Sequence, residues 1–155
     1  MPTIDLPILQ NVEAISSCRD RDALSRIVLQ AAEVLLGKNA EVAIFARMPQ
    51  GETVLKHALG ATDLNPLNAP WPALLDKIPG DGQAHTLADN GRLYGALPLI
   101  SSEIASDHQI LVYATDEAGG DAPLESLSCL VRIYGNQISL LDYSELDTLT
   151  HLLNR

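Results

Sequence analysis

The end of the chain carries an apolar seam that constrains the fold more than any other feature. From residue 124 the apolar side chains recur in steps of 3, 4, 3, 4 and 3 residues, at Leu124, Leu127, Val131, Tyr134, Ile138 and Leu141. This heptad spacing predicts a long helix with one continuous packing face. Beyond Leu141 the seam breaks, and a stripe with Leu146, Leu149 and Leu153 begins out of phase. Such a change of phase fits a helix that leaves one packing partner and joins another.

Two interpretations of this seam stay open. It packs only on a sheet of its own chain, or it also joins a second copy of the chain. A second apolar line through Leu130, Ile133 and Leu140 favours both contacts at once. We therefore expect a homodimer in which the terminal helices meet across a two-fold axis.

The segments before the seam predict two more helices and a set of strands. Pro7 suits the first turn of a helix, and Asp20 or Asp22 can cap a second helix that Gly37 ends. Strand-like runs follow at 41–47, 53–59, 85–89, 92–100 and 109–115. This order predicts an α+β fold with a central antiparallel sheet of about five or six strands and the N- and C-terminal helices packed on one face.

A proline-rich stretch separates the strands into two groups. Residues 61–82 contain four prolines and hold at most a short helix around 71–78, so we expect them to cover the sheet. Trp71 in this cover either stacks on a planar ligand or pins the cover to the core. In the strand 53–59, alternation places His57 on the face of Leu55 and Leu59, where it either reaches a ligand or serves as a core or rim histidine.

The charge balance and the cysteines exclude several classes of partner. The 155 residues hold 20 acidic and 10 basic side chains, and a net charge of −10 repels nucleic acid and anionic membranes. No basic region precedes an apolar run at the N-terminus, so we expect no signal peptide. Cys18 and Cys129 form no C-x-x-C pair, which fits a reducing cytoplasm.

The sequence contains no recognised catalytic or metal-binding motif. It lacks the G-x-x-x-x-G-K-[ST] and G-x-G-x-x-G loops, and its four histidines are not spaced like metal ligands. We therefore expect no catalytic residue, no metal and no cofactor in this chain.

The last nine residues, DTLTHLLNR, resemble the D-x-L-T-G-L-x-N-R opening of the GGDEF family, the diguanylate cyclases. The matching residues are Asp147, Leu149, Thr150, Leu152, Asn154 and Arg155, and His151 stands where the family has glycine. In that family a helix links a sensor to this motif. The resemblance implies that a cyclase domain using GTP and magnesium follows Arg155. The alternative is a chance similarity within a leucine-rich helix.

Residues 20–142 resemble a GAF domain in their order of elements. A capped helix, DRDALSRIVLQAAEVLLG, precedes a strand, and GRLYGALPLI and QILVYAT look like later paired strands. A PAS-like sensor is the nearest substitute. The expected divisions are an N-terminal helix at 1–19, a GAF-like sensor core at 20–123, a signalling helix at 124–146 and the start of a GGDEF domain at 147–155.

These resemblances imply a non-catalytic, cytoplasmic sensory and dimerisation domain of a bacterial diguanylate cyclase, which makes cyclic di-GMP. Its partners would be a second copy, its own GGDEF domain and an unidentified small molecule. Two other functions stay open. One is a GAF- or PAS-like dimerisation module that binds no small molecule. The other is a small cytoplasmic enzyme that uses Cys18 or His57.

Overall fold

The computed structural model describes residues 6–37, 40–48, 50–59, 64–76, 84–89, 91–99, 108–116 and 122–153 of the chain. In these ranges the elements follow in the order α1 (Leu6–Ser17), α2 (Arg21–Leu36), β1 (Glu41–Arg47), β2 (Thr53–Ala58), α3 (Trp71–Leu75), β3 (His85–Asp89), β4 (Arg92–Pro98), β5 (His108–Asp116) and α5 (Ala122–Leu153). The predicted α+β fold is confirmed, with five strands in one sheet. None of the described helices has the length and apolar content that a membrane span requires.

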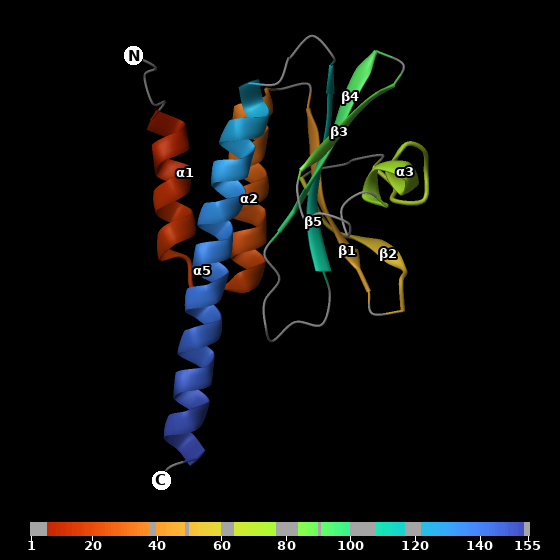
Figure 1. Cartoon of the computed structure of the whole chain (residues 1–155). Coiled ribbons are helices and arrows are strands. Elements are labelled where there is room, and N and C mark those ends of the chain that lie inside the picture. Colours follow the sequence, from red (N-terminus) through yellow and green to blue (C-terminus); the bar gives the residue numbers. More distant parts are fainter. Residues whose placement is uncertain are drawn as a thin grey trace.

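The sheet separates the terminal helices from α3. Its strand order is β2-β1-β5-β4-β3, and every neighbouring pair is antiparallel. Figure 1 shows α2 and α5 against one face of the sheet, α1 outside them, and α3 on the opposite face. The predicted packing of the N- and C-terminal helices on one face is therefore confirmed.

The two central strands are buried on both faces. Residues 42–46 of β1 and 110–114 of β5 are each at most 3% exposed. Apolar strands of this kind need a cover on each side, because an open face would leave their side chains in water. Alternate residues consequently enter two separate cores. Ile44 and Leu111 belong to the core on the helix side, and Phe45 and Val112 belong to the core on the α3 side.

Local signals in the sequence position α2. Asp20 has an extended backbone, and its carboxylate accepts a hydrogen bond from the backbone N–H of Asp22 at 3.3 Å. This N-cap satisfies one of the free N–H groups at the start of the helix. Leu24 and Leu29 are both fully buried, because α2 lies between α1 and the sheet and has packing partners on two sides.

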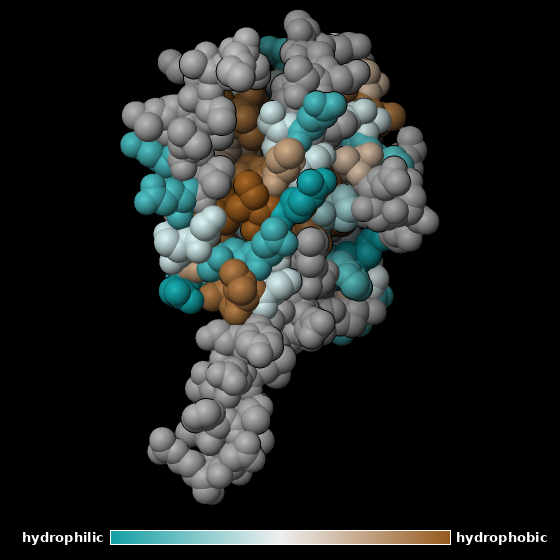
Figure 2. All heavy atoms as spheres, turned by 60° about the vertical axis from the view of Figure 1, so that its left-hand side comes forward, coloured by the Kyte–Doolittle hydropathy of each residue, from teal (hydrophilic) through white to brown (hydrophobic). Residues whose placement is uncertain are grey.

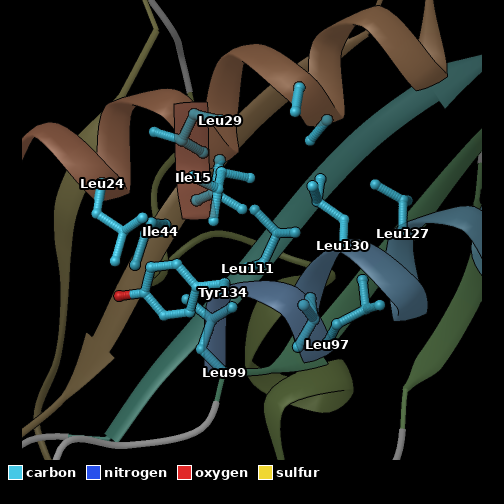
Figure 3. Close-up of a cluster of buried hydrophobic side chains, with 14 of the residues drawn as sticks. Ile15, Leu24, Leu29, Ile44, Leu97, Leu99, Leu111, Leu127, Leu130 and Tyr134 are labelled. Carbon is cyan, nitrogen blue, oxygen red and sulfur yellow. The ribbon is translucent and has the colours of Figure 1, made fainter. Parts of the chain in front are cut away.

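The seam of α5 packs inside its own chain. Its described members, Leu127, Val131, Tyr134, Ile138 and Leu141, all belong to the helix-side core, part of which Figure 3 shows. The side chain of Leu124 lies outside the described residues. On the second apolar line Leu130 is buried, Ile133 is partly buried and Leu140 is 62% exposed. The sequence therefore predicted the helix and its packing face, and the partner that the structure gives this face is the chain's own sheet and helices.

A buried hydrogen bond ties α5 to the junction between α1 and α2. The Nε2 of Gln137 donates to the backbone carbonyl oxygen of Cys18 at 2.6 Å. Gln137 is only 4% exposed, so this bond satisfies an amide that would otherwise be buried without a partner. One turn earlier on α5, the hydroxyl of Tyr134 donates to Oε1 of Gln109 on β5 at 3.3 Å.

Gly95 of β4 makes room for an aromatic ring on the neighbouring strand. Gly95 pairs directly with Tyr113 of β5. A Cβ placed on Gly95 would overlap the ring and the hydroxyl oxygen of Tyr113. Tyr113 is 2% exposed in the helix-side core, so its ring has little freedom to move aside.

We expect Gly95→Ala to lower the free energy of unfolding by about 1–3 kcal/mol, the usual cost of overpacking a core. In the background of Tyr113→Ala the same change should become neutral or stabilising, because alanine suits a strand better than glycine does. Urea unfolding of the wild type, both single variants and the double variant measures this coupling. Equal effects of Gly95→Ala in the two backgrounds would contradict the role given to Tyr113.

Candidate functional site

The face of the sheet opposite α2 and α5 is covered by residues 64–76, which include α3. Asn65 organises the start of this cover. Its Oδ1 accepts from the backbone N–H of Leu67 at 2.9 Å, and its carbonyl oxygen accepts from the N–H of Asn68 at 3.0 Å. Arg47 of β1 donates from Nη2 to the carbonyl oxygen of Leu75 at 3.4 Å. The described part of the cover is thus hydrogen-bonded within itself and to the sheet; residues 61–63 and 77–82 of the predicted cover lie outside the described residues.

Trp71 fills the centre of the α3-side core. It is 2% exposed, and its ring meets those of Phe45 and Tyr94 edge-on, with centroid distances of 5.4 Å and interplanar angles of 83° and 88°. Edge-to-face pairs of this kind each contribute about 0.5–1.5 kcal/mol beyond simple burial. Trp71 therefore pins the cover to the sheet. Stacking on a ligand, the other role considered for Trp71, would require the ring to leave this cluster.

A pocket of about 500 Å³ lies at the edge of the sheet, between β2 and the residues that precede α3. The lining residues are Glu52, Thr53, Val54, Leu55, Leu64, Asn65, Pro66 and Leu67. Leu64 is buried, whereas Leu55 is 41% exposed and Leu67 is 77% exposed. The volume suits a small organic molecule. Its lining would receive an apolar body and leave Glu52 and Thr53 for a polar group.

A bulge in β2 places His57 on the opposite face from this pocket. His57 pairs with Ile44 and Leu55 pairs with Phe45, so Lys56 is the extra residue of a β-bulge. Ile44 belongs to the helix-side core and Phe45 to the α3-side core, so His57 and Leu55 lie on opposite faces. The prediction that His57 shares a face with Leu55 is therefore wrong, although Leu59 does pack on the helix-side core.

The surroundings of His57 favour the neutral imidazole. Burial lowers the pKa of His57 from its ordinary value of 6.5. The carboxylate of Asp22 opposes this shift by attracting the charged form, and the cations of Lys56 and Arg26 add to it by repulsion. These charges also show that His57 faces the first turns of α2.

The other predicted residues that the structure describes do not line the pocket. Of the GGDEF-like opening, Asp147, Leu149, Thr150 and Leu152 lie in the last turns of α5, whereas Asn154 and Arg155 lie outside the described residues. α5 continues without interruption across the expected boundary between residues 146 and 147.

The two cysteines lie on the helix side of the molecule. Cys18 is half-buried, and its thiol donates to the carbonyl oxygen of Asp20 at 3.2 Å. Cys129 is exposed on α5. Within the described ranges, no group of three or more His, Cys, Asp or Glu side chains is arranged to hold a metal ion.

Comparison with solved structures identifies the fold. The chain is similar to residues 122 to 287 of a methyl-accepting chemotaxis protein, with 16% identity and a TM-score of 0.63 over 90% of this chain and 99% of that one. It is similar to the phycoerythrobilin-bound GAF domain of a cyanobacterial phytochrome, with 14% identity and a TM-score of 0.62 over 92% and 99%. It is also similar to a GAF domain/HD domain protein from Geobacter sulfurreducens, with 12% identity and a TM-score of 0.58 over 85% and 98%.

The chain therefore has the fold of a GAF domain, as the order of its elements predicted. At these identities the similarity establishes the fold alone. No protein-family model matches the sequence, and no curated protein matches it.

Sequence reasoning missed the pocket at the edge of the sheet. Its lining comes from two segments, 52–55 and 64–67, and the second of them has no strand or helix pattern. Leu55 and Leu67 would have been the available signal, because both are apolar residues beside polar neighbours. The bulge at Lys56 concealed this signal by making Leu55 look like a partner of His57 on one face.

The depressed pKa of His57 gives the stability a defined pH dependence. Between the folded pKa and the unfolded value near 6.5, the unfolded chain binds a proton that the folded chain does not. The contribution of His57 to stability is thus present above about pH 6.5 and is lost as the pH falls through the folded pKa. Urea unfolding at several pH values should show a smaller loss of stability on acidification in His57→Gln than in the wild type.

Asp22→Asn provides an opposite change for the same experiment. It removes the carboxylate that raises the pKa of His57, so the loss of stability on acidification should extend to lower pH than in the wild type. A pH profile of His57→Gln that matches the wild type would contradict this account.

Proposed function

We propose that this chain is the sensory and dimerisation domain of a cytoplasmic diguanylate cyclase and that it regulates cyclic di-GMP synthesis without being catalytic itself. The GAF fold supports a sensory or regulatory module. The D-x-L-T-x-L-x-N-R match at residues 147–155 supports a cyclase domain after Arg155, and that domain would bind GTP and magnesium.

The single observation that carries this proposal is the course of α5. The first part of α5 packs into the helix-side core through the seam that ends at Leu141. The last part continues beyond the domain to Leu153 (Figure 1). A change in the sheet would therefore move a helix whose last turns carry most of the GGDEF-like opening. Two cyclase domains, each with one GTP, must meet to make the product, so the relative orientation of two such helices would control synthesis.

The dimer contact in this proposal lies where α5 leaves the domain. The seam is occupied by the chain's own core, so a second copy needs another surface. The outward side of α5 is polar at Arg132 and Asn136 and becomes apolar at Leu140. Among the coloured residues of Figure 2, apolar patches alternate with polar ones on this side of the molecule. Leu140 and the leucine stripe that begins at Leu146 would then form the contact between copies.

The proposal predicts where catalysis resides. The gene product that continues past Arg155 should contain a G-G-[DE]-E-F hairpin and convert GTP into cyclic di-GMP with magnesium. Residues 1–155 alone should neither consume GTP nor make the product, because they lack the metal-binding and GTP-binding elements of that family. Chromatographic detection of cyclic di-GMP tests both statements. An unrelated sequence after Arg155, or product formed by a clean preparation of residues 1–155, would overturn the proposal.

Leu140→Glu tests the dimer contact. Glutamate at this exposed position should place like charges at the contact between copies and convert a dimer into a monomer, with the fold intact. Light scattering coupled to size-exclusion chromatography measures the change. Ser139→Glu adds the same charge at the neighbouring exposed position and should weaken the dimer less. Charges at Ile138 or Leu141 are unsuitable for this purpose, because both residues are buried in the chain's own core.

The module that binds no small molecule remains the second candidate, and one observation favours it. Trp71, Leu74 and Leu75 fill the space between the sheet and its cover and are each at most 2% exposed. Under this candidate the pocket between β2 and residues 64–67 stays empty. Calorimetry with cyclic nucleotides and a metabolite panel distinguishes the two functions, since binding of any member supports the sensor and silence throughout supports the module.

A further inference from the structure

The side chain of Arg92 has two buried nitrogens that the fold leaves without an acceptor. Its Nε and Nη2 atoms are buried and have no hydrogen-bond partner in the described part of the chain. Removing guanidinium N–H groups from water without giving them an acceptor is unfavourable. An unpartnered buried group in a folded protein therefore needs an explanation, and a bound molecule that supplies the acceptor is one.

Two aspartates flank Arg92 in the register of the sheet. Arg92 pairs with Asp89 across the β3–β4 hairpin and with Asp116 on β5. Directly paired residues point to the same face, and neighbouring strands lie about 4.8 Å apart. Both aspartates are exposed, and neither accepts a hydrogen bond from Nε or Nη2. The register therefore gives a row of one negative, one positive and one negative residue. It lies where β3 and β5 end and β4 begins, and Figure 1 shows this end of the sheet near the start of α5.

This row borders the aromatic cluster of the α3-side core. Tyr94 lies two residues after Arg92 on β4 and therefore points to the same face. Its ring meets Trp71 edge-on, and Leu87 packs against the same core. A small molecule held by the charged row would thus have apolar and aromatic side chains beside it.

The charges select the class of ligand. A simple anion would satisfy Arg92, but two adjacent carboxylates and a net charge of −10 repel it. A simple amine would satisfy an aspartate and leave the guanidinium without an acceptor. A compact zwitterion meets both needs, because a carboxylate pairs with a guanidinium in a charge-assisted, often bidentate contact while its ammonium group pairs with a carboxylate.

We propose that Asp89, Arg92 and Asp116 bind a zwitterionic small molecule of the free α-amino acid type. Arg92 holds the carboxylate, and Asp89 or Asp116 holds the ammonium group. Arg92 as a whole is only partly buried, so part of this residue is open to solvent next to the exposed aspartates. This site goes beyond the proposed function, because it depends on three residues of the sheet and not on a cyclase domain after Arg155.

Thermal unfolding of the whole 155-residue chain in the presence of each standard L-amino acid tests the proposal. At least one amino acid should raise the midpoint. Two analogues of that amino acid, one without the amino group and one without the carboxyl group, should not raise the unfolding midpoint. For leucine these analogues are 4-methylpentanoate and 3-methylbutylamine. Calorimetry should show at least tenfold weaker binding of the same amino acid to Arg92→Gln and to Asp116→Asn.

Two controls separate binding from folding. Arg132→Gln removes an exposed guanidinium from α5 and should bind the amino acid like the wild type. Arg92→Gln should be at least as stable as the wild type without ligand, because it removes two buried nitrogens that have no hydrogen-bond partner. The proposal is overturned if no amino acid acts, if the acid alone acts as strongly, or if Arg92→Gln binds normally. It is also overturned if Arg92→Gln and Asp116→Asn destabilise the free protein through one shared interaction, which would make the row a structural ion pair.

Discussion

The structure depends on the burial of β1 and β5 on both of their faces. Five consecutive residues of each strand are almost completely removed from water, so neither face of the sheet is able to face solvent. The helices α2 and α5 cover one face, and α1 closes over them. Among the described residues, the other face is covered by 64–76, which include the short α3, and Trp71 belongs to the core beneath this cover. A pocket lies at the edge of the sheet, between β2 and residues 64–67 of the cover.

Sequence patterns predicted the elements well and their partners less well. The heptad steps from Leu124 to Leu141 identified a helix and its packing face, because spacing along a helix depends only on its geometry. Spacing does not say what the face meets, and the described seam residues meet the chain's own sheet and helices. The N-cap at Asp20 was predictable because it is a local contact, between residues only two positions apart in the sequence.

The position of His57 shows where strand patterns fail. Alternation assumes two residues per repeat along the whole strand, and the extra residue Lys56 breaks that period in the middle of β2. A bulge has no compositional signature strong enough to reveal it here. The predicted shared face of His57 and Leu55 is therefore wrong, whereas Leu59, which follows the bulge, lies on the helix side as His57 does. The sequence could not single out Arg92 for another reason. Its interest lies in two buried nitrogens without a hydrogen-bond acceptor, and a missing acceptor is visible only in the folded structure.

The hydrogen bond from Gln137 to the carbonyl oxygen of Cys18 limits how α5 is able to move. A helix held only by apolar side chains can rotate about its own axis, because a neighbouring leucine can then occupy the same packing position. A buried amide with a single acceptor has no such equivalent position, so axial rotation would strand both groups. The hydrogen bond to the junction of α1 and α2 would thus oppose rotation of α5 near the point where the helix leaves the domain. A movement of the sheet would therefore tilt α5 about this hydrogen bond. Because the helix continues to Leu153, a small tilt would displace its end by a larger distance.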